Sequence, residues 1–322
     1  MHAPAPIDPE IRSARRAAVG ALFAAAVALH GCGGGSDEAA SPAPPTSPSP
    51  PPSAPSPPPS SSSTGRFIDS AVGNLGYACT GGGSPNNGIT DSLGNFNYGQ
   101  GQTCTFTVGG ITLGSATAGP LLTPINLVPG AQPGVANTTV TNIARFLMSI
   151  DSDGNPDNGI AIADAVKTAL AGSTLDFAAG NFDTAAAALV NTAINGRALV
   201  DATTANAHLD LSLTNLFAGA YNCTYSAVVN GVDTVLGTVA ITINDGTITG
   251  AGTPAGSNST FDVDGAINPS GAANLSTGGT STGASFVGTF STDGTAANTS
   301  GSGTWDDPEA GSGTWSCHHT TP

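Results

Sequence analysis

Apolar and polar residues alternate along the C-terminal third of the chain. In YNCTYSA (221–227) the odd-numbered positions are apolar and the even-numbered positions are polar, and TVAITI (238–243) continues the pattern. A period of two places successive side chains on opposite faces of a strand. Asn-Gly and Asp-Gly pairs, which favour tight turns, help to separate about eight such segments. Residues 217–322 are therefore predicted to form an antiparallel meander.

The segment GSGTWDDPEAGSGTW, which ends at Trp315, contains the same five-residue word twice. It predicts a hairpin with its turn at 306–309 and with Trp305 and Trp315 pointing inward beside Cys317. Cys223 lies in the first predicted strand, so a disulfide to Cys317 would join the two ends of the meander. The prediction is an eight-stranded up-and-down barrel in which the first strand pairs with the last.

Residues 65–216 show a different pattern. Up to about residue 113, short segments of period two alternate with Gly, Asn and Asp turns, which predicts a small β-sandwich-like unit. Apolar and alanine-rich stretches then favour helices, which are predicted at 137–150, 161–171, 182–195 and 203–216. The predicted fold class is mainly β, with a helical segment between an N-terminal β-unit and a C-terminal barrel.

The first 31 residues have the pattern of a secretory signal peptide. Three arginines precede an apolar run of 15 residues, which is too short to span a bilayer comfortably. Leu29 and Gly31 before Cys32 resemble the bacterial lipobox, although His30 departs from the small residue usual at its position. The resemblance implies cleavage after Gly31 and a diacylglycerol on Cys32. A soluble secreted protein or an uncleaved membrane anchor is the alternative.

The residues after Cys32 predict where the folded part is held. Lipoproteins with an Asp after the lipidated cysteine stay at the inner membrane, whereas Gly33 stands here. We therefore expect a lipid-anchored protein of the bacterial cell envelope, at the outer membrane or the cell surface. Residues 32–64 are predicted to be a disordered stalk, because 41–64 contain 11 prolines and no residue that could build a core. A proline-motif ligand is the alternative for this segment.

Part of the N-terminal β-unit resembles a known family. Residues 90–98 follow the order T-D-x-x-G-x-F-x-Y of carboxypeptidase-regulatory-like modules, which implies that Gly94 makes a turn and that Phe96 and Tyr98 enter a core. From 65 to about 150 the chain also resembles a family of bacterial surface lipoproteins of undetermined activity. That family shares the β-unit and a helix ending in D-x-D-G-N-P-D-N-G-I. The resemblance implies location and architecture, and no chemistry.

Composition narrows the possible partners. With 22 acidic and 7 basic residues, the net charge is −15, and the chain lacks the basic patches that nucleic acid binding needs. We interpret the negative charge first as a solvated acidic surface, and a calcium-rich surface is the alternative interpretation. If Cys32 carries lipid, the other four cysteines would form two disulfides in an oxidising compartment. Three pairings are open, and the predicted domain boundaries favour Cys79–Cys104 and Cys223–Cys317.

An acidic loop is the candidate metal site. Its potential ligands occupy every second position, as in the first half of an EF-hand loop, and are Asp151, Asp153, Asn155 and Asp157. Oxygen ligands from a tight loop suit Ca²⁺. However, glycine occupies the fourth loop position, Pro156 the sixth and Ile162 the twelfth, so the bidentate acid of an EF-hand is missing, with Asp164 as a possible substitute. A plain turn between two helices is the alternative.

Catalytic motifs are missing from the sequence. It contains no G-x-S-x-G, H-E-x-x-H or phosphate loop, and His208 in its alanine-rich segment favours a packed or capping role over that of a general base. We therefore expect a non-enzymatic binding or interaction module that needs no cofactor, with calcium as the exception. Its partner would be a protein, a glycan or another envelope component. The alternative is a small-ligand carrier whose barrel interior is hollow and lined by the two tryptophans.

The lipobox makes a direct prediction for the Cys32→Ser variant. Without the thiol no diacylglycerol can be attached, so the precursor should stay uncleaved or the protein should leave the membrane fraction. Metabolic labelling with a clickable palmitate measures this, and equal label on wild type and Cys32→Ser would contradict the predicted lipidation.

Overall fold

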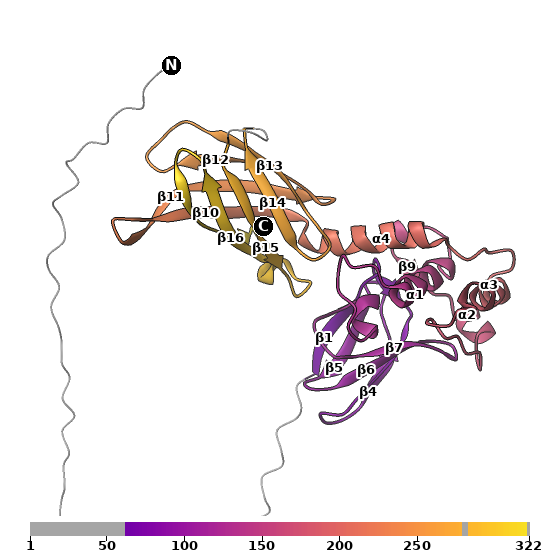
Figure 1. The fold of residues 1–322 in the computed structure, drawn as a ribbon. Helices are drawn as coiled ribbons and strands as arrows, with labels where there is room; N and C mark the ends of the chain where they lie inside the picture. The colour runs from indigo at the N-terminus through magenta and orange to yellow at the C-terminus, as the bar shows by residue number, and fades with distance from the viewer. Residues whose placement is uncertain (1–61, 279–282, 321–322) are drawn as a thin grey trace, which may run out of the picture. The chain divides into compact units, whose positions relative to one another are not determined.

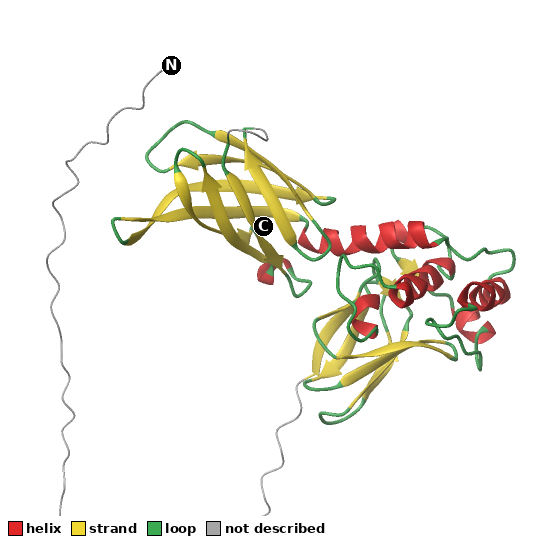
Figure 2. Cartoon of the chain, viewed as in Figure 1, coloured by secondary structure: helices red, strands yellow, loops and turns green. Residues whose placement is uncertain are grey.

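The computed structural model describes residues 62–278 and 283–320. The predicted signal peptide (1–31), Cys32 and the predicted stalk up to residue 61 lie outside the described residues. In the described part of the chain, no helix combines the length and apolar character needed to cross a membrane. The fold is mainly β (Figures 1 and 2). Two hydrophobic cores form, one from residues before Phe217 and one from Phe217 onward.

The N-terminal unit contains two main sheets. One has the order β5 (Asn95–Gly99), β1 (Ser62–Phe67), β8 (Leu121–Leu122), and the other has the order β4 (Asn86–Ile89), β3 (Gly76–Thr80), β6 (Thr103–Val108), β7 (Ile111–Thr117). A short parallel pair joins β2 (Val72–Gly73) to β9 (Ile160–Ala161). β1 begins three residues inside the predicted stalk, because Ser62, Ser63 and Thr64 pair with β5.

Aromatic rings from different strands build the core of this unit. The ring of Phe106 lies 4.7 Å from that of Phe67 and 5.3 Å from that of Phe96, measured between centroids. Phe96 is buried and Tyr98 is half-buried, as the T-D-x-x-G-x-F-x-Y pattern implies. Gly94 makes the turn before them with a φ of 78°, a conformation that glycine adopts without steric cost.

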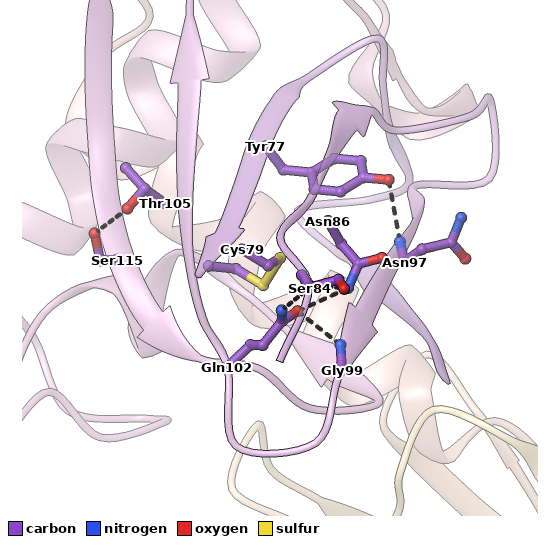
Figure 3. Close-up of a disulfide and its surroundings, with 10 residues drawn as sticks. Tyr77, Cys79, Ser84, Asn86, Asn97, Gly99, Gln102, Thr105 and Ser115 are labelled. Atoms are coloured by element: carbon purple, nitrogen blue, oxygen red, sulfur yellow. Dashed lines mark hydrogen bonds between the residues drawn. A yellow bond between two sulfur atoms is a disulfide. The ribbon is translucent and has the colours of Figure 1, made fainter. Parts of the chain in front are cut away.

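The first disulfide joins Cys79 in β3 to Cys104 in β6, which are directly opposite each other. The buried side chain of Gln102 lies close by, where its Oε1 accepts a 2.7 Å hydrogen bond from the Gly99 amide and its Nε2 donates to the Ser84 carbonyl (Figure 3). The covalent bond and the buried amide together fix the register of these strands.

Four α-helices occupy the four predicted positions. They are α1 (Thr138–Ser149), α2 (Asp164–Ala169), α3 (Phe182–Ala193) and α4 (Ala202–Thr214), with short 3₁₀ turns η1 (Pro124–Leu127), η2 (Pro156–Asn158) and η3 (Asn215–Phe217). Asn137 caps α1, since its side chain accepts hydrogen bonds from the amides of Thr139 and Val140. α2 is shorter than the predicted 161–171 at both ends, and at its start Ala161 pairs in β9 and Ile162 forms a bridge with Asp151.

The C-terminal unit is a closed antiparallel barrel of eight strands (Figure 1), as predicted. Its strands are β10 (Gly219–Val229), β11 (Val232–Asn244), β12 (Thr247–Pro254), β13 (Phe261–Ile267), β14 (Ala272–Thr277), β15 (Ser285–Ser291), β16 (Ser300–Asp307) and β17 (Gly311–His319), with η4 (Ala296–Asn298) before β16. β10 pairs with β17, and Cys223 lies opposite Cys317 and forms the second disulfide with it.

The repeated G-S-G-T-W words form β16 and β17. In their register Gly303 lies opposite Trp315, and Trp305 lies opposite Gly313. A Cβ on Gly303 would come within 2.8 Å of the Trp315 Nε1, and a Cβ on Gly313 within 2.6 Å of the Trp305 Nε1. Each word therefore supplies one tryptophan and the glycine that makes room for the other.

Both tryptophans are buried, as predicted. Trp305 Nε1 donates a 2.9 Å hydrogen bond to the Ser226 carbonyl, and Trp315 Nε1 donates a 3.1 Å bond to the Thr304 carbonyl. The predicted turn at 306–309 is displaced, because β16 continues through Asp307, whose carboxylate then accepts the amides of Glu309 and Ala310.

Removal of the second disulfide should destabilise the barrel. The bond joins residues 94 positions apart, so the Cys223→Ala/Cys317→Ala variant should lose about 2–5 kcal/mol of unfolding free energy. Denaturant titration followed by tryptophan fluorescence measures this, since the chain's two tryptophans both lie in the barrel.

Cys79→Ala/Cys104→Ala is the matched control, because it removes a disulfide from the other hydrophobic core. It should leave the tryptophan transition where it is in the wild type. If both double variants moved the tryptophan transition equally, the assignment of barrel closure to Cys223–Cys317 would be wrong.

Candidate functional site

The four predicted calcium ligands are divided between two places. The buried Asp151 accepts the Ala161 amide on Oδ1 at 2.8 Å, and Asp153 accepts the Asn155 amide and the Asn158 side chain. Burial raises the pKa of Asp151, and the neighbouring Asp153 carboxylate adds to the increase. Asp157 lies in η2 and approaches a histidine instead. The structure therefore brings Asp151 and Asp153 together and places Asp157 elsewhere.

Calcium binding at this loop stays a prediction. Among residues 62–278 and 283–320, no three His, Cys, Asp or Glu side chains converge in a way that could hold a metal ion. Within the described part of the chain, the Asp151 Oδ2 atom is nevertheless buried without a hydrogen-bond partner, and the Asp153 carboxylate neighbours this residue. The hydrogen bonds within the loop are sufficient to hold its turn. A bound cation would therefore add its contacts to a turn that already exists.

A second polar cluster forms around His208, on α4. The imidazole Nε2 lies 3.2 Å from the Ser70 Oγ, and Nδ1 lies 3.4 Å from an Asp157 carboxylate oxygen. The Ser212 Oγ accepts the Ser70 amide at 2.9 Å and lies 3.4 Å from the Ser70 Oγ. A serine, a histidine and an aspartate thus lie in one row, although they come from three distant parts of the chain.

Local structure explains why these side chains meet. Asp69 and Ser70 form the tight turn between the bridge partners Ile68 and Ala71, and Ser70 has a φ of 52°, which is rare for a residue with a side chain. His208 and Ser212 are four residues apart, so they lie on the same face of α4.

The cluster opens into a pocket of about 350 Å³. Ser70, His208 and Asp157 line it together with Arg66, Ile68, Ala71, Leu211 and Leu216. The polar row therefore meets an apolar wall at a concave surface, which is the usual character of a small-molecule site.

Asp69 lies between the pocket-lining residues Ile68 and Ser70 and is fully buried. Among the described residues, neither of its carboxyl oxygens has a hydrogen-bond partner, and Oδ1 lies 3.9 Å from the His208 Nε2. Burial disfavours the charged form and raises the pKa of Asp69 to about 7. An unpartnered buried carboxyl is unusual in a folded protein and needs an explanation.

The sequence did not reveal this cluster. His208 is packed, as predicted, but its contacts with Ser70 and Asp157 were missed because Ser70 lies 138 positions from His208. The one local signal is the spacing of His208 and Ser212 on a predicted helix, which places two polar groups on one face.

The barrel also presents an unusual apolar element at one end. The tip of the β10–β11 hairpin, residues 227–236, extends beyond the segments paired with β17 and β12. Of the nine large apolar side chains exposed among the described residues, four lie in this tip: Val228, Val229, Val232 and Val235, with exposed fractions of 70, 43, 63 and 56%. We call residues 227–236 the valine hairpin.

Side chains fill the barrel interior. Tyr225 contacts the rings of Phe261, Phe286 and Trp305 at centroid distances of 6.1, 6.4 and 5.9 Å. A cavity of about 20 Å³ lies among residues that include Cys223, Tyr225 and Trp315. That volume suits one water molecule.

Comparison with known proteins gives no relative for this chain: no family model, no curated protein and no solved structure matches it. Its function has to be inferred from its own residues.

The buried Asp69 predicts a pH-dependent stability. The folded state keeps the carboxyl proton up to about pH 7, whereas an unfolded carboxyl releases it near 3.8. Between these values the folded state binds more protons, so the unfolding free energy falls as pH rises, by at most about 1.4 kcal/mol per pH unit. The Asp69→Asn variant should lack this decrease when unfolding is followed by circular dichroism at pH 4.5, 6 and 7.5.

Asp233→Asn is the matched control, since it removes an exposed carboxyl. It should follow the wild-type pH curve. Parallel curves for wild type and Asp69→Asn would contradict the elevated pKa.

Proposed function

We propose that this protein is a lipid-anchored protein of the bacterial cell envelope that binds a protein partner through the valine hairpin. Its folded units would be carried away from the membrane by the proline-rich stalk, with Cys32 as the anchor. The exposed valines are the observation that carries the binding proposal.

The disulfides support the proposed location. Cys79–Cys104 and Cys223–Cys317 each join facing strands within a separate hydrophobic core. Structural disulfides persist in oxidising compartments and are rare in the cytosol. They agree with the signal peptide and lipobox patterns, which predict a folded chain outside the cytoplasm.

The valine hairpin supports a protein partner over a glycan. Exposed apolar side chains gain free energy when they are buried against other apolar groups, at roughly 25 cal/mol per Å². Glycans offer mainly hydroxyls, and nucleic acids would be repelled by the net charge of −15. Beyond the barrel wall, the two strands of the hairpin pair with each other, and among the described residues one further backbone hydrogen bond reaches them, from the Ala255 amide to the Leu236 carbonyl. Their outer edges therefore have backbone groups to which a partner strand could add.

The barrel interior supports this proposal over the carrier alternative. Pockets for small ligands typically have volumes of about 300–1,000 Å³, whereas the cavity beside Tyr225 has about 20 Å³. A ligand would have to displace the packed rings around it. The exterior of the barrel is thus the better place for recognition.

Site-specific photocrosslinking in intact cells tests the proposal. A photoreactive amino acid at Val228 or Val232 should form a discrete higher-mass adduct with a protein, because both side chains are highly exposed. Thr242 and Thr249 are matched controls, since they are exposed on paired barrel strands. They should form little or none of the adduct.

Equal adduct yields at all four positions would indicate random encounters and contradict a specific hairpin site. A ladder of lipid adducts at Val228 and Val232, without a protein adduct, would also overturn the proposed partner class.

A further inference from the structure

We propose that Ser70, His208 and Asp157 form a hydrolytic site that cleaves small carboxylic esters through an acyl-serine intermediate. Ser70 is the nucleophile, His208 is the general base, and Asp157 is a positioning residue. This inference is independent of the valine hairpin and adds an activity to the binding function proposed above.

The distances give each side chain its role. Ser70 Oγ can donate its proton to His208 Nε2 across 3.2 Å, and Asp157 lies 3.4 Å from Nδ1 on the other side of the ring. The tautomer with a lone pair on Nε2 accepts the Ser70 hydrogen and carries its own hydrogen on Nδ1, which Asp157 approaches as an ion-pair partner. Nucleophile, base and orienting acid in this order define the Ser-His-Asp arrangement on unrelated folds.

The backbone conformation of Ser70 is of a kind that is often found at functional side chains. Its φ of 52° holds the residue in the left-handed region at a tight turn. Strained backbone of this kind tends to occur where function fixes a side chain. Here it leaves Ser70 on the lining of the pocket, while its amide is bound by Ser212.

The buried Asp69 contributes to this arrangement as a second acidic group beside His208. When Ser70 gives up its proton, His208 becomes a cation between the Asp157 carboxylate at Nδ1 and Asp69, whose Oδ1 lies 3.9 Å from Nε2. Above the pKa of Asp69, which burial raises to about 7, two carboxylates beside the ring would stabilise the imidazolium. No residue that the structure describes gives Asp69 a hydrogen-bond donor that would otherwise explain its burial.

The reaction balances with water as the second reactant. The Ser70 Oγ bonds to the ester carbonyl carbon while its proton moves to His208 Nε2. The ester C–O bond then breaks, and the leaving alcohol takes that proton. Water, deprotonated by His208, attacks the acyl-serine, and its hydroxyl oxygen ends in the carboxylic acid while the proton returns to Ser70 Oγ. The Ser212 hydroxyl, 3.4 Å from Ser70 Oγ, is a side-chain donor placed near the developing oxyanion.

The pocket suggests the class of ester. Its volume of about 350 Å³ suits a molecule of modest size, and Ile68, Leu211 and Leu216 offer contact to a short acyl chain. Arg66 also lines the pocket and could contact a polar or anionic group on the alcohol side. Esters with short acyl groups are therefore the expected substrates.

Fluorophosphonate labelling of the full-length protein, purified from membranes in detergent, tests the site. The probe should modify Ser70, as located by peptide mass spectrometry, should leave Ser70→Gly unlabelled, and should label His208→Gln at least 100-fold more slowly. Glycine tolerates the positive φ of residue 70, so the Ser70→Gly variant should keep the wild-type melting temperature. Ser316→Ala, which removes a hydroxyl from a barrel strand, is the matched control and should label as wild type.

Hydrolysis of p-nitrophenyl acetate by the same proteins should follow the labelling rates. Asp157→Asn should slow both at least 10-fold and change the pH profile of labelling, whereas Asp157→Glu should restore part of the rate; a merely structural residue would leave the pH profile unchanged.

Either of two results would overturn the proposal. One is wild-type protein without a Ser70 adduct under conditions that fully label a known serine esterase. The other is a folded His208→Gln variant that labels Ser70 at the wild-type rate.

Discussion

The pairing of β10 with β17 is the contact on which the C-terminal architecture depends. An antiparallel meander leaves two open edges unless its first and last strands meet, and open edges invite pairing with other chains. Here six residue pairs and the Cys223–Cys317 bond join the two edges. Closure directs one face of all eight strands inward, where the tryptophans of the repeated word lie opposite glycines. The polar outer face then needs few charged residues to remain solvated.

Barrel closure also explains the exposed position of the valine hairpin. β10 and β11 are the longest strands of the barrel, and their neighbours stop pairing near Ser226 and Gly237. The hairpin is thus built on a rigid frame, but its own tip lacks pairing on either outer side. In the N-terminal unit a packed core likewise positions the groups of interest. It holds the Asp69–Ser70 turn, η2 and α4 so that their side chains come together. In both units, stable packing presents the groups that we propose to be functional.

The architecture could be predicted from the sequence, and the candidate sites could not. Three signals were sufficient to predict the barrel and both disulfides: the alternation in segments such as TVAITI, the Gly and Asn turns, and the positions of the cysteines. The first two are set by neighbouring residues in the sequence, and the third by which predicted strand each cysteine occupies. The length of the valine hairpin depends on register and on a bulge at Tyr225/Ser226, which periodicity does not encode. The Ser70–His208 contact depends on packing between segments far apart in sequence. Asp157 has the spacing of a calcium ligand, yet tertiary structure directs it to His208.

Amide hydrogen exchange of the intact protein tests the central structural claim most directly. If the barrel is closed and the valine hairpin projects from it, amides hydrogen-bonded between β10 and β17 should exchange only through global unfolding. Amides of residues 228–235 should exchange faster by orders of magnitude. Rapid exchange along β17 would contradict a closed barrel, and strong protection of the hairpin tip would contradict a free binding element.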